Sequence, residues 1–272
     1  MAAIPFPNID PVLLRVGPLQ VHWYGLAYVA GFVAAALILR WCARRWGIEL
    51  STDDTIELVL AAVIGVILGA RLGYVLVYGG APYWNEPLRI LAIWDGGMSF
   101  HGGLVGILIA CAIEAPRLGM SFLQLADLGA VGAPVGFGLG RLANFVNAEL
   151  WGRVTTVPWA VVFPGAGPLG RHPSQLYEAF LEGVVLLVTL LLLARRRRPE
   201  GEMLGWLLLL YGGFRFTVEF MREPDPQLGF ITGGLTMGQL LSIPMAAVGI
   251  WLLVRARRRG GAPTSAGSPS RS

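Results

Sequence analysis

Several residue types are scarce or missing in this 272-residue chain: lysine is absent, and there are only two cysteines, three histidines and 14% charged residues. Without lysine the chain has no Schiff-base former and no lysine general base. The chain also lacks the His-Glu-x-x-His zinc pattern, the Walker phosphate loop and the Gly-x-Ser-x-Gly elbow. These absences exclude the enzyme classes that depend on those motifs. Cys42 and Cys111 fall near the ends of apolar stretches, where we expect no structural disulfide.

Apolar residues, in contrast, make up 55% of the chain and gather in long runs. A helix needs roughly 20 apolar residues to cross a hydrocarbon core of about 30 Å. We therefore expect an all-α polytopic membrane protein with seven transmembrane helices, at 22–42, 56–79, 100–115, 122–140, 175–194, 203–221 and 237–254. Glycines at four-residue spacing predict faces where helices approach closely. They are Gly65, Gly69 and Gly73 in the second stretch and Gly132, Gly136 and Gly140 in the fourth.

Arginine supplies all the basic side chains, and most of the 21 arginines fall in alternate connections and in the tail. By the positive-inside rule, the amino terminus lies outside and the carboxyl terminus lies in the cytoplasm. We interpret the arginine run at 195–198 as a topological anchor and not as a nucleic-acid site. The expected organisation is one membrane domain at 1–255, with outer connections at 80–98 and 141–174 and a disordered cytoplasmic tail at 256–272.

Arg215 lies inside the apolar stretch 203–221, where a guanidinium costs roughly 2.5 to 3.5 kcal/mol even on lenient insertion scales. Glu219 follows about one turn later on the same helical face. Two further residues extend that face: Tyr211 and Arg222. A charge at this depth normally faces a protein interior, so we expect an anion site. The alternative is an Arg215–Glu219 ion pair that only stabilises the bundle. Arg71 is a second arginine within a stretch, and we expect it to snorkel outward.

Polar residues of other stretches fall at the same expected depth, near the outer ends of the helices. Tyr24 begins the first stretch, His101 begins the third and Arg141 ends the fourth. The fifth stretch is preceded by His172 and begins with Gln175 and Glu178. We expect these three residues, and Arg222, to be secondary residues of the site. Segments far apart in the sequence therefore converge at one depth.

The chemistry of these residues suits an anionic lipid head group. Arginine is the natural ligand for phosphate, because its planar fork donates two parallel hydrogen bonds and stays ionised. Arg141 is followed by amides and a carboxylate that can orient such a group: Asn144, Asn147 and Glu149. His101 lies between glycines, and an imidazole accepts protons near neutral pH. The structural alternatives are a helix-end network at Arg141 and a merely hydrogen-bonded His101.

These residues lie in segments that resemble the bacterial prolipoprotein diacylglyceryl transferase family. The matching segments are HWYGLAYVAGF around Tyr24, GGMSFHGGL around His101, GRLANFVNAELWGR around Arg141, RHPSQLYEA from Arg171, and YGGFRFTVEFMREPD from Tyr211. Segments this long, in this order and on a seven-stretch frame, make the resemblance specific. Ala143 and Ala148 stand where the family usually has glycine, and both changes leave the polar residues intact.

The resemblance implies an enzyme of the bacterial inner membrane with its active site on the periplasmic side. Its reaction would transfer the diacylglyceryl group of phosphatidylglycerol to the lipobox cysteine of a prolipoprotein signal peptide, with release of glycerol phosphate. No metal, organic cofactor or nucleic acid is implied.

The resemblance also assigns roles to single residues. Arg141 is then the main phosphatidylglycerol-binding residue and Arg215 a second essential contact. Other positions that match functional residues of the family are His101, Tyr24, Asn144, Gly152, Tyr211 and Glu219. We expect His101, Arg141 and Arg215 to be catalytic. The rival hypothesis from another class is a seven-span transporter for an anion or a lipid.

Overall fold

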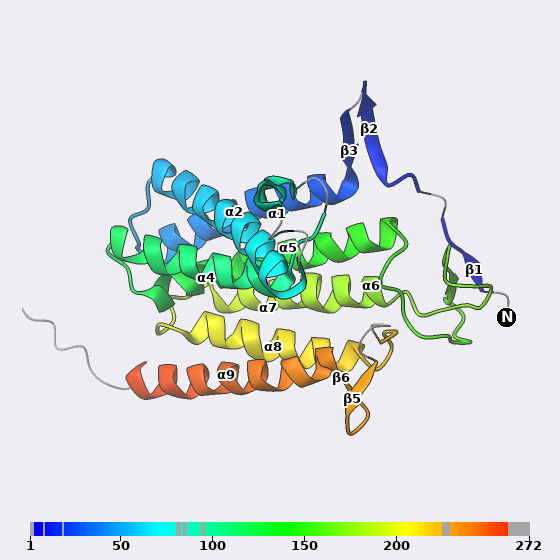
Figure 1. Cartoon of the computed structure of the whole chain (residues 1–272). Coiled ribbons are helices and arrows are strands. Elements are labelled where there is room, and N and C mark those ends of the chain that lie inside the picture. The colour runs from blue at the N-terminus through cyan, green and yellow to red at the C-terminus, as the bar shows by residue number, and fades with distance from the viewer. Residues whose placement is uncertain are drawn as a thin grey trace, which may run out of the picture. The chain divides into compact units, whose positions relative to one another are not determined.

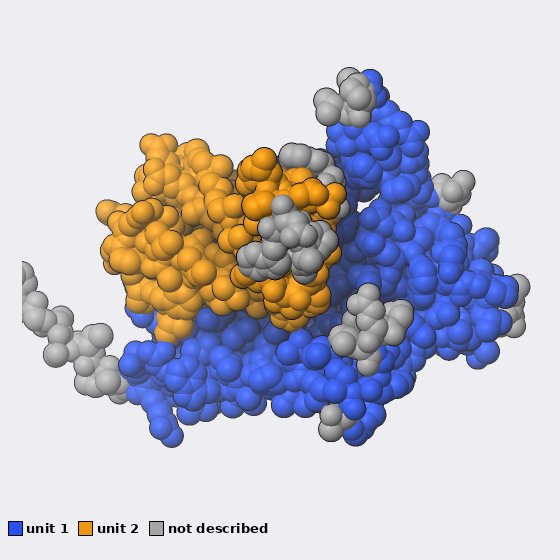
Figure 2. All heavy atoms as spheres, in the orientation of Figure 1, with its two compact units in different colours: residues 1–31, 130–272 blue, residues 32–129 orange. Residues whose placement is uncertain are grey.

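The computed structural model describes residues 3–7, 9–17, 19–79, 83, 86–93, 96–224 and 229–260. Within these residues the chain is mostly helical, and short strands pair in two-stranded sheets (Figure 1). The chain divides into two compact units (Figure 2). The first unit consists of residues 1–31 and 130–272, and the second consists of residues 32–129.

Six helical segments among the described residues are long and apolar enough to cross a membrane: Trp23–Arg45, Thr52–Gly79, Phe100–Arg117, Phe122–Val146, Ser174–Leu193 and Met237–Arg259. Each overlaps one of the expected stretches. The remaining expected stretch, 203–221, contains helix α8 (Glu202–Val218), whose 17 residues make it shorter than those six. Large apolar side chains are exposed along these helices, as expected for surfaces that face lipid. The chain is therefore a multi-pass membrane protein.

The second unit is built around two tightly packed helices, α2 (Thr52–Tyr74) and α4 (Phe100–Arg117). Between them, α2 continues into the π-helical turn η1 (Val75–Gly79), and the 3-10 helix η2 (Pro87–Leu91) follows. A capping box starts α2, because Ser51 Oγ accepts from Asp54 N at 2.9 Å and Asp54 Oδ2 accepts from Ser51 N at 2.8 Å.

Glycines bring α2 and α4 into close contact, as the four-residue spacing predicts. A Cβ atom added to Gly65 would lie 2.6 Å from the Gly106 carbonyl oxygen. The backbones of Gly69 and Gly73 meet the backbone of Gly102 in the same way. The expectation of a close helix contact on this face of α2 is confirmed.

Arg71, near the end of α2, corrects the sequence interpretation. Its side chain is buried and does not snorkel outward. The guanidinium donates hydrogen bonds to backbone carbonyls of the connection before α4: Arg89 (2.6 Å), Ile90 (2.9 Å), Ala92 (2.9 Å), Gly97 (3.1 Å) and Gly96. Snorkelling is unnecessary because these carbonyls satisfy the guanidinium inside the protein.

The first unit carries the strands, residues 23–31 of α1 (Trp23–Arg45), residues 130–146 of α5 (Phe122–Val146) and the helices that follow α5. Its sheets are β1 (Ile4–Pro5) with β4 (Val161–Val162), β2 (Val12–Val16) with β3 (Leu19–His22), and β5 (Phe230–Thr232) with β6 (Leu235–Thr236). The β2–β3 hairpin leads into α1 (Trp23–Arg45), and the β5–β6 hairpin leads into α9 (Met237–Gly260). Residues 256–260, expected in the tail, therefore extend α9, and residues 261–272 lie outside the described residues.

Two further helix contacts in this unit also depend on glycine. Helix α8 lies beside α9 (Figure 1), where a Cβ atom added to Gly249 would be 2.8 Å from the Gly205 carbonyl oxygen. One continuous segment is formed by α6 (Ser174–Glu178), the π-helical η4 (Ala179–Val185) and α7 (Leu186–Leu193). This segment meets α5 (Phe122–Val146) through two glycines, Gly138 and Gly183.

Helix α5 makes two close contacts through glycine. A Cβ atom added to Gly31 of α1 would lie 3.3 Å from Gly136 Cα, so one of the predicted positions lies at a helix contact. A Cβ atom added to Gly138, which the spacing did not include, would lie 3.0 Å from Gly183 Cα. Arg141 lies three residues after Gly138 and so on the same face of α5. The glycine contact thus brings Arg141 up to the acidic residues of α6 and η4.

Candidate active site

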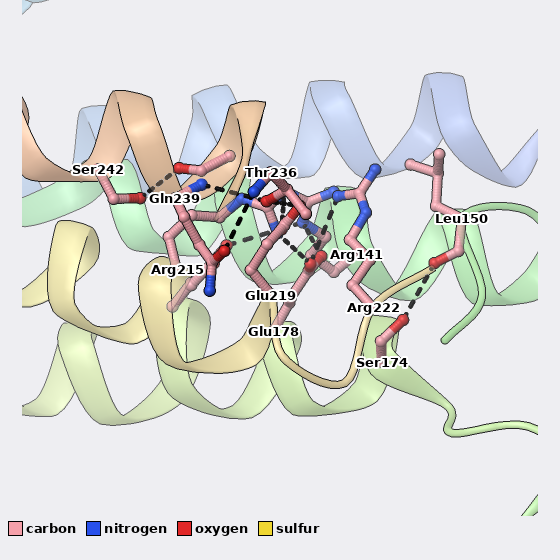
Figure 3. A network of polar contacts seen from close by, with 12 residues as sticks. Arg141, Leu150, Ser174, Glu178, Arg215, Glu219, Arg222, Thr236, Gln239 and Ser242 are labelled. Carbon is pink, nitrogen blue, oxygen red and sulfur yellow. Dashed lines mark hydrogen bonds and ion pairs between the residues drawn. The ribbon is translucent and has the colours of Figure 1, made fainter. Parts of the chain in front are cut away.

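Three arginines and three glutamates meet inside the first unit and form what we call the arginine–glutamate cluster. Figure 3 labels all of its members except Glu182. They come from the carboxyl end of α5, from α6 and η4, and from the carboxyl end of α8 and the residues just after it. The members are Arg141, Glu178, Glu182, Arg215, Glu219 and Arg222. The expectation that Arg141 and Arg215 approach one another from separate helices is met within this unit.

Glu178 is the shared partner at the centre of the cluster. Its Oε1 atom lies 2.6 Å from Arg215 Nη1 and 3.5 Å from Arg222 Nη1, and its Oε2 atom lies 2.6 Å from Arg141 Nε. The carboxylate is buried, so solvent screens these ion pairs little. From the sequence Glu178 ranks as a secondary residue, whereas the geometry puts it between three guanidinium groups.

Arg215 lies between two carboxylates. Its Nη2 atom is 2.7 Å from Glu219 Oε2, one turn along α8, and its Nη1 atom is hydrogen-bonded to Glu178 on α6. The ion pair with Glu219 that the spacing allows is therefore present. It is only part of the arrangement, because Arg215 also joins α8 to α6.

Glu219 is held from its other side by residues at the start of α9. Thr236 Oγ1 donates to Glu219 Oε1 at 2.9 Å, and Gln239 Oε1 accepts from Thr236 N at 3.1 Å. A Cβ atom added to Gly238 would lie 2.7 Å from the Glu219 carboxyl carbon. Sequence reasoning missed these three residues, although the run of polar and small residues where the last stretch begins was a signal.

Glu182 was also missed. It lies in the π-helical turn η4, it is fully buried, and its Oε2 atom is 3.7 Å from Arg141 Nε. Among the residues that the structure describes, neither of its carboxylate oxygens has a hydrogen-bonding partner. Its position four residues after Glu178 in an apolar stretch was the available signal. Single π-helical turns within α-helices are frequent at functional sites.

The segment after α5 brings the expected amides together around Glu149. Asn144 Nδ2 donates to Glu149 Oε1 at 2.7 Å, and Asn147 Nδ2 donates to the same oxygen at 3.4 Å. Gln175 Nε2 donates to the Glu149 backbone carbonyl at 2.6 Å. The turn is unusual because Ala148 and Leu150 adopt positive φ angles of 52° and 57°. The glycine that the resemblance predicts at position 148 would fit this backbone better than alanine.

Gly152 lies where three chain segments meet. Its backbone N–H donates to the His172 carbonyl at 2.8 Å, and it forms a β-bridge with Arg222. A Cβ atom added here would lie 2.6 Å from that His172 carbonyl oxygen, so only glycine fits without displacement. Arg153 Nε then donates to the Arg222 carbonyl at 2.9 Å. These bonds fix the backbone of Arg222, whose side chain belongs to the cluster.

His172 belongs to a hydrogen-bonded group of aromatic residues. Its Nδ1 atom is 3.2 Å from the Tyr177 hydroxyl oxygen, which accepts from Trp159 Nε1 at 2.6 Å. Burial lowers the pKa of the His172 imidazole, which favours the neutral ring. The position of His172 thus indicates a role in holding the connection between α5 and α6.

One tyrosine of the first unit lies beside Arg141. The Tyr211 ring packs 5.0 Å from the Phe137 ring, and its hydroxyl lies beside the Arg141 guanidinium. In the first turns of α1, the ring of Tyr24 lies 5.1 Å from the ring of Tyr28. Both tyrosines that the sequence singled out, Tyr24 and Tyr211, therefore belong to the first unit with Arg141.

His101 lies in the second unit, in the first turn of α4. Ser99 caps that turn by accepting a hydrogen bond from Gly102 N at 3.3 Å. The His101 side chain is exposed, and its ring contacts the Phe100 ring edge-on at 5.6 Å. An exposed imidazole at a helix start is accessible to a reactant.

The fold and the cluster define a class of protein: a multi-pass membrane protein with a buried ionic cluster whose arginines come from separate helices. Charges inside a membrane protein usually mark a site for an ion or a substrate.

Comparison with known proteins narrows this class. The family model for prolipoprotein diacylglyceryl transferase matches residues 11–255. The phosphatidylglycerol–prolipoprotein diacylglyceryl transferase of Geobacter sulfurreducens is 52% identical over 254 residues, which cover 93% of this chain and 98% of the relative. The protein of the same name from Chromohalobacter salexigens is 53% identical over 257 residues, which cover 94% of this chain and 96% of the relative. The chain belongs to the prolipoprotein diacylglyceryl transferase family, which confirms the resemblance seen in its sequence.

Proposed function

We propose that this chain transfers the diacylglyceryl group of phosphatidylglycerol to the lipobox cysteine of a prolipoprotein signal peptide, forming a thioether and releasing glycerol phosphate. The names of its relatives identify phosphatidylglycerol and prolipoprotein as what those proteins act on. The observation that carries the proposal is the pairing of Arg141 and Arg215, from separate helices, with the two oxygens of the buried Glu178 carboxylate.

The geometry of the guanidinium groups supports phosphate binding. The Arg141 and Arg215 side chains are 19% and 13% exposed, whereas Glu178 is 1% exposed. The carboxylate thus holds the arginines from the buried side, and their partly exposed edges remain for an anion. Among the described residues, both ion pairs of Arg141 are made through Nε, and its Nη groups would donate to a phosphate.

The reaction gives these arginines a catalytic role. The cysteine thiolate attacks the glycerol carbon that bears the phosphate ester, and the bond between that carbon and the ester oxygen breaks. A phosphodiester with one negative charge becomes a monoester approaching two. Arg141 and Arg215 would bind this growing charge more tightly than the starting lipid, and such differential binding accelerates a reaction.

The thiol must lose its proton before it attacks, because an ordinary thiol with a pKa of about 8.5 is mostly protonated at neutral pH. We assign this step to His101. An arginine, or Glu219 acting through a water molecule, is the alternative base. The assignment predicts that His101→Gln loses the acidic limb of the pH–rate profile. An unchanged acidic limb in that variant would remove His101 as the titrating base.

The other expected site residues have supporting roles in this proposal. Asn144, Asn147 and Glu149 would orient the head group through the turn that Gln175 holds. The aromatic residues Tyr24 and Tyr211 would line the lipid beside Arg141. Gly152 would allow the close packing that fixes Arg222.

For the membrane topology we propose seven spans, with α8 as the sixth in sequence order. The amino terminus would then be periplasmic and the carboxyl terminus cytoplasmic. The basic last turn of α9, with Arg257, Arg258 and Arg259, fits a cytoplasmic end. In this orientation the arginine–glutamate cluster lies in the periplasmic half of the inner membrane.

A transporter is the rival function for a buried arginine cluster in a membrane protein. The family assignment and the names of the relatives favour the transferase. A transporter would move an anion or lipid across liposomes and would leave a cysteine peptide unmodified.

The direct test combines the purified protein, phosphatidylglycerol vesicles and a lipobox peptide. Mass spectrometry should show a peptide carrying a diacylglyceryl thioether. The control is the same peptide with serine in place of cysteine, which should stay unmodified because a hydroxyl is a far weaker nucleophile than a thiolate. Transfer to the serine peptide, or no product with the cysteine peptide, would contradict the proposal.

A further inference from the structure

The arginine–glutamate cluster must accommodate additional negative charge if it binds a phosphate. It contains as many arginines as glutamates, so its formal charges balance when all six side chains are ionised. A lipid phosphate adds a further negative charge to a poorly hydrated interior. Uncompensated charge in such a place is costly, and uptake of a proton by a nearby carboxylate relieves it.

The three carboxylates differ in how well they are satisfied. Glu178 pairs closely with Arg141 and Arg215. Glu219 pairs with Arg215 and accepts a hydrogen bond from Thr236. Glu182 has the 3.7 Å approach to Arg141 Nε, and among the described residues both of its oxygens lack a hydrogen-bonding partner. Glu182 is therefore the carboxylate whose negative charge the protein stabilises least.

We propose that Glu182 takes up one proton from solvent when a lipid phosphate binds to Arg141 and Arg215. The inference rests on the proposed function, since it assumes that phosphate binds at this cluster. Glu182 balances Arg141 while the cluster is unliganded. The phosphate takes over that charge when it binds, and Glu182 becomes a neutral acid. In this role Glu182 is a positioning residue that acts through Arg141.

The groups around Glu182 favour its protonation when phosphate binds. The charged and titratable groups that face it come from every neighbouring element of the unit: Arg141 on α5, Glu178 on α6, Tyr211 and Arg215 on α8, and Arg222 after α8. The guanidinium groups are the ligands expected for phosphate, so binding weakens the attraction that keeps Glu182 ionised. Glu178 remains nearby as a like charge, which also favours the neutral acid.

Calorimetry of the full-length protein in detergent tests the proposal. A short-chain phosphatidylglycerol is titrated into the protein without peptide, so that binding occurs without transfer. The binding enthalpy is measured between pH 6 and 9 in buffers of different ionisation enthalpy. We expect an uptake approaching one proton per lipid, and a dissociation constant that rises by up to about tenfold per pH unit where the proton is taken up.

Two variants give the comparison its control. Glu182→Gln resembles the protonated acid in shape, so its lipid dissociation constant should no longer vary with pH in this way. Glu202→Gln removes a carboxylate of the same unit that pairs with Arg198 at 3.5 Å outside the cluster. It should keep the proton uptake of the parent protein.

The outcomes separate this inference from the transferase function. If the parent protein forms the thioether but binds lipid with no proton uptake, the role of Glu182 is wrong and the transferase function stands. The same holds if Glu182→Gln takes up as many protons as the parent protein. If the protein neither binds the lipid nor forms product, both proposals are overturned. The calorimetry of the parent protein decides the question even if Glu182→Gln does not fold.

Discussion

Arg71 in the second unit donates to five backbone carbonyls, whereas Arg141 and Arg215 in the first unit pair with glutamate carboxylates. All three arginines belong to helices of a membrane protein, where an unpartnered guanidinium is costly. The two solutions have different consequences, because a carbonyl is a fixed dipole with no net charge. A carboxylate has a net charge that a proton or another anion can replace.

Pairing with backbone carbonyls fits a structural role for Arg71. Arg71 binds carbonyls of η2 and of the residues between η2 and α4. These hydrogen bonds fix the chain directly before Ser99 and His101. An anion at Arg71 would have to displace several backbone hydrogen bonds at once. Pairing with carboxylates fits a reactive site at Arg141 and Arg215, since one incoming phosphate can replace one carboxylate as their partner.

The largest effect expected from this comparison is the loss of stability in Glu178→Ala. Removing the carboxylate leaves three guanidinium groups close together without their shared partner. Breaking a buried ion pair in this way costs about 3 to 5 kcal/mol. Thermal unfolding in detergent measures the loss. The matched control is Glu202→Ala, which breaks a more exposed pair with Arg198 and should cost less than about 1 kcal/mol.

Equal losses in these two variants would contradict the central position of Glu178. A phosphate analogue added to Glu178→Ala sharpens the test. Because the anion supplies the missing charge, it should restore part of the lost stability. The same addition should not help Glu202→Ala.

Arg141→Lys should reduce turnover by roughly 10²- to 10³-fold, which is the usual cost of removing one electrostatic contact to a developing charge. A lysine keeps the charge but loses the planar fork, so lipid binding should weaken less than turnover. Steady-state assays with the lipobox peptide give kcat and KM separately. Arg117→Lys, which changes an exposed arginine of the second unit, should retain full activity. Unchanged kcat with weaker lipid binding in Arg141→Lys would remove the electrostatic role.

Much of the helical frame was predictable from the sequence, because hydropathy and length act locally along the chain. The convergence of Arg141 and Arg215 was also predictable, since both are charges in apolar surroundings that require a partner. The partner itself was not. Glu178 was placed at the correct helix end, but its contact with three arginines depends on how α5, α6 and α8 pack.

Arg71 and Glu182 show why the remaining features escaped sequence analysis. The carbonyls that satisfy Arg71 carry no sequence signal, because every residue has one. Glu182 faces Arg141 because of the π-helical turn and the close contact of Gly138 with Gly183, neither of which hydropathy reveals. Backbone geometry at the helix contacts therefore decides the identity of the partners.

Arg71→Lys should destabilise the protein and leave the chemistry largely intact. A lysine ammonium offers three donors where the guanidinium offers five, so at least two of these carbonyls lose their hydrogen bond to the side chain. The expected loss is about 2 to 3 kcal/mol. Thermal unfolding measures it, and transferase assays well below the unfolding transition should give a kcat within a few-fold of the parent protein. A loss of kcat as large as that in Arg141→Lys would erase the distinction between the two kinds of arginine.

The connections next to these arginines extend the comparison. The one that Arg71 holds has glycines at positive φ, with Gly96 at 80° and Gly97 at 75°. The one that follows α5 has non-glycine residues in the same region, with Ala148 at 52° and Leu150 at 57°. A left-handed backbone costs a non-glycine residue about 1 to 2 kcal/mol. The turn that presents Glu149 is therefore strained, whereas Gly96 and Gly97 adopt the left-handed backbone without this cost.

Ala148→Gly should relieve that strain and raise the free energy of unfolding by about 0.5 to 1 kcal/mol, because the greater flexibility of glycine in the unfolded chain offsets part of the gain. Ala143→Gly is the matched control five residues earlier, within α5, where glycine should destabilise by about 0.5 to 1 kcal/mol. Thermal unfolding of both variants gives the signs. Destabilisation by both would mean that Ala148 is unstrained. If Ala148→Gly stabilises the protein, Ala143→Gly destabilises it and kcat stays unchanged, the strain comes only from having alanine at position 148. The catalytic geometry around Glu149 then does not need it.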